Sequence, residues 1–346
     1  MNAAIRAVAK VAASKGVAVW GIEGGFDGLI DARLRPLTQT AAGGTLDLTE
    51  EVENAGNRGG TLLGTARSPR FLQRSSRAEA AATVADYSLD GLIVIGGNGS
   101  LTGARHLADE HGIQVVGIPA TIDNDIGLTR EAIGVDTALN TVAEACDRIC
   151  DTATAHRRAF IVEVMGRHSG YLAMSAAAAV GADAVLLPER RRSDDEIVQA
   201  VAEVLRARFA ARKDRRRALI IKAEGVEYPT EELVAAVERE LAGQLKVDVR
   251  ATILGHVVRG GSPTHRDRAL AGRFGLVAVE ALLQGHSRVM TGWNIEAGGV
   301  ATSDKWIQLF DLEVVEAASA ALLDGTSQVI KERLERLERM QGVLSI

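Results

Sequence analysis

The sequence predicts an α/β protein with two lobes, each built on a mostly parallel sheet with helices on both faces. Two observations lead to this prediction. Short apolar runs alternate with stretches of helical periodicity along most of the chain, which is the pattern of doubly wound parallel sheets. The length of 346 residues exceeds that of a usual single hydrophobic core, so two lobes are expected.

The predicted strands are runs of branched or long apolar side chains, and the predicted helices carry apolar residues at helical spacing. The strands occupy residues 17–22, 91–95, 114–118, 159–164, 184–187, 218–221 and 249–254. The helices occupy residues 1–15, 77–87, 101–110, 136–155, 194–211, 230–241, 267–284 and 326–340. In such sheets the functional loops lie at the carboxyl ends of the strands.

Charge, cysteine spacing and the pattern of apolar residues argue against several classes of protein. The formal net charge of −5 gives no reason to expect a nucleic acid as partner, because binding its backbone requires a basic surface. Cys146 and Cys150 lie four residues apart in a helical pattern, which indicates one helix face and not a disulfide framework. Residues 171–187 are interrupted by Gly181 and Asp183, so a buried helix followed by a strand is expected there, not a membrane span. A cytoplasmic protein without a membrane partner is therefore expected.

A glycine-rich loop follows the second predicted strand. Residues 92–95 are Leu-Ile-Val-Ile, and residues 96–100 are Gly-Gly-Asn-Gly-Ser. Glycine lets the backbone approach a phosphate closely, and the start of the following helix adds favourable partial charge. The loop matches neither the P-loop nor the dinucleotide-binding pattern, so a phosphate site here is a prediction from local chemistry.

A second polar cluster follows the strand at residues 114–118. If the segment is extended, its period of two places Thr121, Asp123 and Asp125 on one face. That would align one hydroxyl with two carboxylates. The alternative is a surface turn, because Asp and Asn favour turns.

Several arginines lie at strand boundaries. Arg158 and Arg167 bracket one predicted strand, and Arg250 begins another that leads toward Arg259. Guanidinium groups bind phosphate oxygens with paired N–H donors, so their convergence would indicate a phosphorylated substrate. Surface ion pairs are the alternative for each one alone.

Two further residues lie on loops. Arg67 follows another glycine-rich segment, and its alternative role is that of an ordinary surface arginine. Glu224, after the strand at 218–221, could accept hydrogen bonds from sugar hydroxyls; capping a helix is the alternative.

Together these motifs resemble the 6-phosphofructokinase family. The family's order is a Gly-Gly-Asp-Gly-Ser/Thr loop, Pro-Gly-Thr-Ile-Asp-Asn-Asp, Met-Gly-Arg, and Leu-Gly-His-x-x-Arg-Gly-Gly. Here the corresponding residues are 96–100, 119–125, 165–167 and 254–261, in that order. The resemblance implies two Rossmann-like three-layer lobes. It assigns residues 1–135 and 255–300 to a nucleotide-binding lobe, and residues 136–254 and 301–346 to a sugar-phosphate-binding lobe.

The resemblance also implies the reaction: transfer of the γ-phosphoryl group of ATP to the C1 hydroxyl of fructose 6-phosphate. Asp123 would be the general base, and Asp125 would lie close to the magnesium and the reacting groups. Thr121 would hold the transferring group, and Arg67 and Arg167 would neutralise its charge. The substrate-binding set would comprise Thr121, Ile122, Asp123, Arg158, Met165, Gly166, Arg167, Glu224, Arg250, His256 and Arg259. Arg158 and Arg250 would come from a neighbouring subunit, which implies a homotetramer with shared sites.

For the nucleotide, the resemblance implies binding by Arg67, Ser68, Gly97, Asn98, Gly99 and Ser100, with Mg²⁺ near Asn98 and Asp125. Diphosphate-dependent members tend to carry Asp at the position of Gly99 and Lys at that of Ala120, so this chain is expected to use ATP. A diphosphate-dependent enzyme, or a binding paralogue with impaired catalysis, is the alternative.

The chain departs from the family pattern in two places. Asn98 replaces an aspartate that coordinates magnesium, and this removes one negative charge from the site. The family's first strand and its Gly-Gly-Asp loop are also expected to be missing ahead of the helix at residues 1–15.

Overall fold

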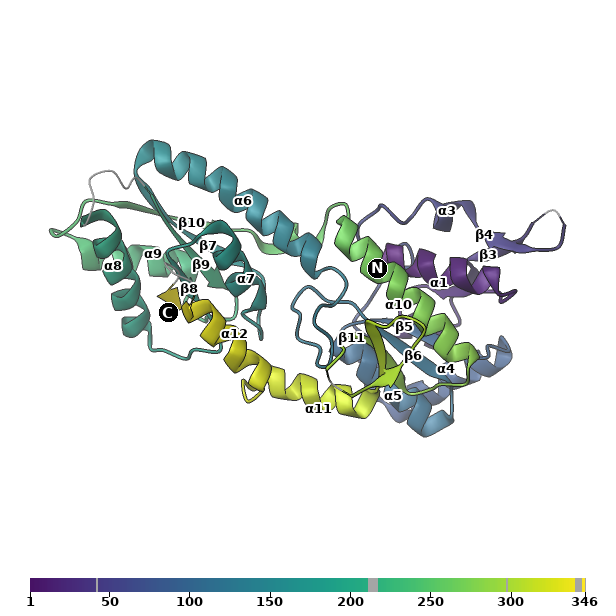
Figure 1. Ribbon diagram of the computed structural model, residues 1–346. Helices are drawn as coiled ribbons and strands as arrows, with labels where there is room; N and C mark the ends of the chain where they lie inside the picture. The colour runs from purple at the N-terminus through teal and green to yellow at the C-terminus, as the bar shows by residue number, and fades with distance from the viewer. Residues whose placement is uncertain (42, 211–216, 297, 340–343, 346) are drawn as a thin grey trace. The chain divides into compact units, whose positions relative to one another are not determined.

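The computed structural model describes residues 1–41, 43–210, 217–296, 298–339 and 344–345 (Figure 1). The chain forms two compact units. The first comprises Met1–Thr121, Ile126–Asp136 and Gly261–Ala320, and the second comprises Ile122–Asp125, Thr137–Gly260 and Ala321–Ile346. These units differ from the predicted lobes at four places: residues 122–125 and 255–260 lie in the second unit, and residues 136 and 301–320 lie in the first.

The first unit contains a five-stranded sheet. Its order is β12 (Val300–Ala301), β13 (Ile307–Asp311), β11 (Val289–Trp293), β6 (Val115–Pro119) and β5 (Leu92–Gly96). Strands β5, β6 and β11 are parallel, and β13 is antiparallel to both β11 and β12. The sheet is therefore parallel at the side that carries the glycine loop and antiparallel at the other.

Helices cover both faces of this sheet. Helices α1 (Asn2–Ser14) and α10 (His265–Leu283) pack against each other and share a core with Val116 and Ile118 of β6. On the opposite face, a Cβ atom at Gly117 would meet the Leu101 side chain of α5 (Asn98–His111), and Leu312 of α11 (Leu312–Leu323) lies next to it. The expected three-layer arrangement is confirmed in this unit.

The remaining elements of the first unit precede β5. They are β1 (Trp20–Ile22), α2 (Phe26–Ile30), β2 (Leu34–Pro36), β3 (Thr38–Thr40), β4 (Leu46–Leu48), α3 (Glu50–Glu53), the 3₁₀ turn η1 (Arg70–Leu72) and α4 (Arg74–Asp86). Strand β1 pairs antiparallel with β2, and β3 with β4. The predicted strand at residues 17–22 is thus shorter than expected, and in the described part of the chain it pairs only with β2.

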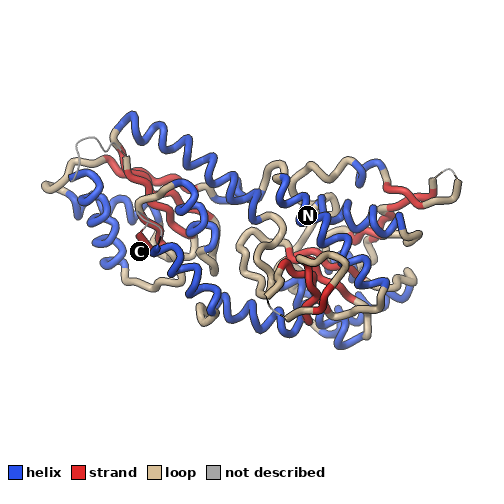
Figure 2. The backbone as a smooth tube through the Cα atoms, in the orientation of Figure 1, coloured by secondary structure: helices blue, strands red, loops and turns tan. Residues whose placement is uncertain are grey.

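The second unit contains a sheet in which every described pair of strands is parallel. Its order is β10 (Asp248–Ile253), β7 (Arg158–Val164), β9 (Ala218–Ala223), β8 (Ala184–Leu186) and β14 (Leu344–Ser345). Figure 2 shows these strands lying between helices. The parallel α/β class predicted from the alternating pattern is therefore confirmed.

Successive side chains of β7 pack against the helix layers on opposite faces of the second sheet. Phe160 and Val162 pack against α6 (Val135–His156) and α7 (Tyr171–Val180), whereas Ile161 packs against α8 (Asp194–Ala210) and α9 (Thr230–Leu241). A strand buried on both faces carries a nearly continuous run of apolar residues, and in β7 this run is Ala159–Val162. Among the described residues the last helix is α12 (Gln328–Arg339).

Residues 171–187 form α7 and then β8, as the sequence predicts. Among the described helices, none combines the length and the apolar character that crossing a membrane would need.

Candidate active site

The glycine-rich loop joins β5 to α5 in the first unit, as predicted. Gly97 caps α5, and its carbonyl accepts hydrogen bonds from the N–H groups of Ser100 and Leu101. A Cβ atom at Gly96 would lie 2.5 Å from the Ser100 Oγ, so this glycine makes room for the serine side chain. A Cβ atom at Gly99 would meet no atom within 4 Å beyond its chain neighbours and the backbone of its own helix. Open space therefore lies over the first turn of α5, where N–H groups attract anions.

Thr121 lies beside this loop within the first unit. The Ala120 N–H donates to the Gly96 carbonyl at 2.9 Å. The position of a Cβ atom on Gly97 is 3.7 Å from the Thr121 Cβ. The two motifs are far apart in the sequence, and the pairing of β5 with β6 brings their ends together.

Ser68 is fixed by two hydrogen bonds in the same unit. Its hydroxyl donates to the Asp27 carboxylate of α2 and accepts from the Phe71 N–H at 3.2 Å. Stacking of the Phe26 and Phe71 rings, whose centroids are 3.9 Å apart, supports this contact. The adjacent Arg67 is exposed on the loop before η1.

The expected extended row from Thr121 to Asp125 is wrong. The chain bends at residues 122 and 123, and Asn124 adopts a left-handed conformation with φ of 48°. Asn tolerates this conformation better than most residues. The turn is not a surface turn either, because Asn124 is only 1% exposed. Asp123 and Asp125 belong to the second compact unit, whereas Thr121 belongs to the first.

Asp123 lies in an environment that favours a basic carboxylate. Burial raises its pKa, the Arg259 guanidinium opposes this rise, the Glu224 carboxylate adds to it, and His168 opposes it. The Ser169 hydroxyl donates to the Asp123 carbonyl at 2.9 Å and anchors the backbone. A carboxylate with a raised pKa accepts a proton more readily than an ordinary aspartate, which suits a general base.

Arg167 and Glu224 meet at the carboxyl ends of β7 and β9. The Arg167 guanidinium lies 3.6 Å from the Glu224 carboxylate. Two glycines allow the loops to pack this closely. A Cβ atom at Gly225 would lie 2.1 Å from the Arg167 carbonyl oxygen, and one at Gly166, whose φ is 138°, would lie 2.4 Å from the Ser169 carbonyl oxygen.

Arg259 approaches the same end of the sheet from the 3₁₀ turn η2 (Gly255–Arg259), which also carries the exposed His256. The Leu254 N–H donates to the Glu163 carbonyl at 3.0 Å and fixes the start of this turn. The Arg259 Nε donates to the Met165 sulfur at 3.3 Å. Residues from three of the predicted motifs therefore converge within the second unit.

Arg158 and Arg250 lie at the opposite end of this sheet. Both bind Asp248, at 2.7 and 2.8 Å. Burial opposes ionisation of Asp248, but hydrogen bonds from Arg250 and Arg158 hold its pKa below the usual value. Since a strand rises about 3.3 Å per residue, the seven residues of β7 separate Arg158 from the Arg167 end by about 20 Å. A single chain thus does not bring all the predicted arginines together.

Sequence reasoning missed three neighbours of the site. His168 and Ser169 directly follow the Met-Gly-Arg motif. His168 interacts electrostatically with the Asp123 carboxyl group, and the Ser169 hydroxyl donates a hydrogen bond to the Asp123 carbonyl. Their position next to the motif was the available signal. Asp27, which holds Ser68, lies in a short helix that carries no recognisable pattern.

The donor set available to a metal is small. Among the described residues, no group of three or more His, Cys, Asp or Glu side chains could hold an ion. Mg²⁺ characteristically binds through one or two carboxylates, with waters and substrate phosphates completing its shell. Asp125 in the second unit and Asn98 in the first each offer an oxygen ligand of a kind that Mg²⁺ accepts.

Comparison with known proteins identifies relatives along most of the chain. The Phosphofructokinase family model matches residues 1–282. ATP-dependent 6-phosphofructokinase 1 of Thermus thermophilus is 46% identical over 84% of this chain and 85% of its own length. ATP-dependent 6-phosphofructokinase of Thermotoga neapolitana is also 46% identical, over 84% of each chain.

Solved structures agree with these relatives. Phosphofructokinase from Saccharomyces cerevisiae superposes with a TM-score of 0.79 at 32% identity; the match covers 97% of this chain but 48% of that one, so this chain spans about half its length. A pyrophosphate-dependent phosphofructokinase from Marinobacter aquaeolei shares the fold with a TM-score of 0.74 at 19% identity, covering 97% of this chain and 87% of that one. From its sequence and its fold, this chain belongs to the phosphofructokinase family.

Proposed function

We propose that this chain is an ATP-dependent 6-phosphofructokinase, which transfers the γ-phosphoryl group of ATP to the C1 hydroxyl of fructose 6-phosphate. The observation that carries the proposal is the setting of Asp123, a buried carboxyl group with a raised pKa that Arg259 and Glu224 influence directly. The names of its close relatives support the same activity.

The second unit supplies the sugar-phosphate side of the proposed reaction. Asp123 accepts the proton of the C1 hydroxyl as its oxygen attacks phosphorus, and Arg167 stabilises charge on the transferring group. Glu224 binds sugar hydroxyls, while His256 and Arg259 bind the 6-phosphate. Positioning and charge neutralisation supply most of the rate in phosphoryl transfer. General-base catalysis adds roughly 10²- to 10⁴-fold.

The first unit supplies the nucleotide side. Residues Gly97 to Ser100 hold phosphates through the N–H groups at the start of α5, with Arg67, Ser68 and Thr121 nearby. The open space at Gly99 supports ATP as donor, because an aspartate there would repel the α-phosphate of the nucleotide. Relatives named as ATP-dependent favour the same donor over diphosphate.

Mg²⁺ is the proposed metal, held by Asp125 and by the Asn98 amide. When bound, it neutralises charge on the ATP phosphates. Asn98 offers a carbonyl oxygen without a negative charge, so this chain's own contribution to metal binding is weaker than that of an aspartate.

We also propose a cytoplasmic homotetramer with shared active sites. Arg158 lies about 20 Å along the sheet from the end of β7 that leads to Arg167. Arg250 is the register partner of Phe160 and lies about 13 Å from that end. In this assembly they bind the sugar phosphate of another subunit. A symmetric assembly makes this possible by contributing the same residues to each neighbouring site.

The direct test is ADP formation that depends on fructose 6-phosphate, in the presence of ATP and Mg²⁺. The wild-type chain is expected to turn over, and Asp123→Ser is expected to lose roughly 10²- to 10⁴-fold in kcat. Asp195→Ser is the matched control, because Asp195 is an exposed aspartate at the start of α8; it should keep full activity. Diphosphate should not replace ATP.

Thermal unfolding separates the competing functions. If ATP and fructose 6-phosphate raise the Tm while no ADP forms, the chain is a binding paralogue and the proposed activity is wrong. If diphosphate supports turnover and ATP does not, the proposed donor is wrong.

A further inference from the structure

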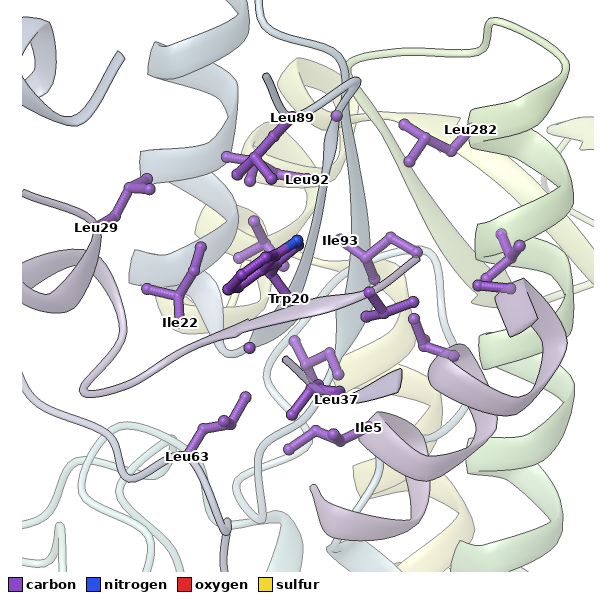
Figure 3. Close-up of a pocket in the computed structure, with 18 of the residues that line it drawn as sticks. Ile5, Trp20, Ile22, Leu29, Leu37, Leu63, Leu89, Leu92, Ile93 and Leu282 are labelled. Atoms are coloured by element: carbon purple, nitrogen blue, oxygen red, sulfur yellow. The ribbon is translucent and has the colours of Figure 1, made fainter. Parts of the chain in front are cut away.

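Two features of the molecule lie apart from the residues proposed for catalysis. The first is a cavity of about 590 Å³ between β1 and β5 of the first unit, which is lined mainly by apolar side chains (Figure 3). Of the residues proposed for catalysis, only Ser100 lines it. The second is a cluster of Arg333, Tyr171 and Glu189 in the second unit. This cluster adjoins the loop after Arg167, and its contacts lead to Asp123.

Helix α12 places a cation over the first residue of α7. The Arg333 guanidinium carbon lies 4.5 Å from the centroid of the Tyr171 ring. Leu334 packs against the same hydrophobic cluster as Tyr171, so two adjacent residues of α12 contact this part of the unit. The face of an aromatic ring attracts a cation, and the attraction is stronger where water is excluded. Arg333 therefore restrains the ring of Tyr171.

A carboxylate lies on the other side of this cluster. Burial lowers the pKa of Arg333, Tyr171 and the Glu189 carboxylate oppose this fall, and Arg336 adds to it. The Glu189 Oε1 accepts a hydrogen bond from the Gly170 N–H at 2.8 Å. The Glu189 Oε2 is buried and has no hydrogen-bond partner among the described residues. A buried carboxylate oxygen without a hydrogen bond is unfavourable unless a positive charge compensates it, and Arg333 interacts with it electrostatically.

Gly170 and Ser169 connect the cluster with Asp123. A Cβ atom at Gly170 would lie 2.6 Å from the Glu189 Oε2, so the glycine lets the turn approach the carboxylate closely. The Tyr171 N–H donates to the Ser169 Oγ at 3.3 Å, and the buried Ser169 hydroxyl donates to the Asp123 carbonyl at 2.9 Å. A continuous series of contacts thus joins Arg333 to the backbone of the proposed general base.

We propose that Arg333 is a positioning residue for phosphoryl transfer. It restrains Tyr171 and Glu189, these two hold the turn at residues 169–170, and the turn fixes Asp123 for proton abstraction. The inference rests on the proposed function of Asp123. Misplacing a reacting group by about 1 Å can lower a rate by about 10²-fold, so a residue outside the substrate site can affect kcat.

Substitutions of Arg333 test the role of its charge. Arg333→Met keeps the apolar stem of the side chain, so the Tm should change little, but kcat for ADP formation should fall about tenfold. The KM for ATP should stay the same, because the residues proposed to bind the nucleotide lie in the first unit. Arg333→Lys returns a cation to the Tyr171 ring and should recover at least half of the wild-type kcat.

Arg339→Met is the matched control. Arg339 is an exposed arginine of the same helix and pairs with Glu335, so this variant should keep the wild-type kcat. If Arg333→Met lowers kcat and Arg333→Lys lowers it equally, the charge of Arg333 does not position the turn and the proposal is wrong.

A double variant tests whether Arg333 acts through Tyr171. Tyr171→Leu removes the ring on which the guanidinium lies and should also lower kcat. Because both substitutions break one contact, Arg333→Met combined with Tyr171→Leu should lose no more kcat than the larger single loss. Losses that multiply would mean that the two residues act independently, which would overturn the proposed series of contacts.

Hydrogen exchange, measured by NMR without substrates, reports the turn itself. In Arg333→Met the Gly170 and Tyr171 amides should exchange at least tenfold faster than in the wild-type chain, while the Ile221 amide in the centre of the second sheet stays protected. If the wild-type chain forms no ADP, the proposed function fails, and the catalytic role of Arg333 fails with it. If ADP forms, unchanged exchange or an unchanged kcat in Arg333→Met overturns the role of Arg333 alone.

Discussion

Burial raises the pKa of the Asp123 carboxyl group. The positive charge of Arg259 opposes this rise, the Glu224 carboxylate adds to it, and His168 opposes it. A general base works only when deprotonated, so activity is present above this pKa and is lost as the pH falls through it. The acid limb of kcat/KM should therefore lie above the ordinary aspartate pKa of 3.8.

The variant Glu224→Gln tests the assignment of this limb. Removing the negative charge of Glu224 removes a contribution that raises the Asp123 pKa, so the limb should move to lower pH even though sugar binding weakens. Glu227→Gln, a variant of a nearby exposed glutamate, should leave the limb in place. If the acid limb of kcat/KM stays at the same pH in Glu224→Gln, the limb reports the titration of a group other than Asp123.

Asn98 is a proposed magnesium ligand, and a substitution tests this role. Asn98→Asp adds a negative charge at the start of α5, and at an effective dielectric near 20 one charge about 4 Å from another contributes about 4 kcal/mol. The magnesium concentration giving half-maximal rate should fall. Asn54→Asp, at an exposed position, serves as the control. An unchanged magnesium requirement would argue against a ligand role for Asn98.

The residue types of the site could be predicted from the sequence, but part of its geometry could not. The Gly96 to Ser100 loop was predicted because a strand, three glycines and a helix are contiguous. The alignment of Asp123 with Asp125 was predicted wrongly, because the left-handed conformation of Asn124 depends on the surrounding buried packing. Ser169 was not predicted because its hydrogen bond to the Asp123 carbonyl joins residues that are far apart in the sequence.

At the scale of the elements, a buried ion pair joins β7 and β9, the strands that lead to the candidate active-site loops. The Lys222 ammonium lies 3.0 Å from the Glu163 carboxylate, and the Lys222 side chain is 2% exposed. Thr230 at the start of α9 donates a further hydrogen bond to Glu163. Glu163 and Lys222 are register partners on the strands that lead to Arg167 and Glu224.

Removing the Lys222 side chain should destabilise the fold. Lys222→Ala leaves the Glu163 carboxylate buried beside one hydroxyl, so the free energy of unfolding should fall by about 3–5 kcal/mol. Urea unfolding measures this loss. The exposed Lys246→Ala is the control, and the double variant Lys222→Met/Glu163→Leu should recover much of the stability. A loss below about 1 kcal/mol for Lys222→Ala would contradict a coupled buried pair.

Among the elements, the long apolar runs were predicted well. Residues 159–164 and 218–221 became central strands because both of their faces are buried. Residues 17–22 form a shorter strand than predicted, paired only with β2 in the described chain. Apolar pattern indicates burial, but it does not specify which partner provides the backbone hydrogen bonds.

At the level of the whole molecule, the separation of Arg250 from Arg167 leads to a test of shared sites. Chains carrying Asp123→Ser or Arg250→Ala should each be inactive alone. Co-expressed, they should recover about a quarter of the wild-type activity, because random assembly leaves that share of sites with both groups intact.

The pairing of Asp123→Ser with Arg167→Ala is the matched control. Both groups lie at the same end of one chain's second unit, so mixed assemblies contain no intact site and should stay inactive. If the Asp123→Ser and Arg250→Ala chains also fail to complement each other, Arg250 does not serve a neighbouring site.

The central claim is transfer of phosphorus to one particular oxygen atom. Fructose 6-phosphate labelled with ¹³C at C1, incubated with the enzyme, ATP and Mg²⁺, reports this transfer in its ¹³C NMR spectrum. The account predicts that the C1 signal acquires coupling to phosphorus as ADP forms, and that Asp123→Ser suppresses both changes. ADP formation with an uncoupled C1 signal would contradict it.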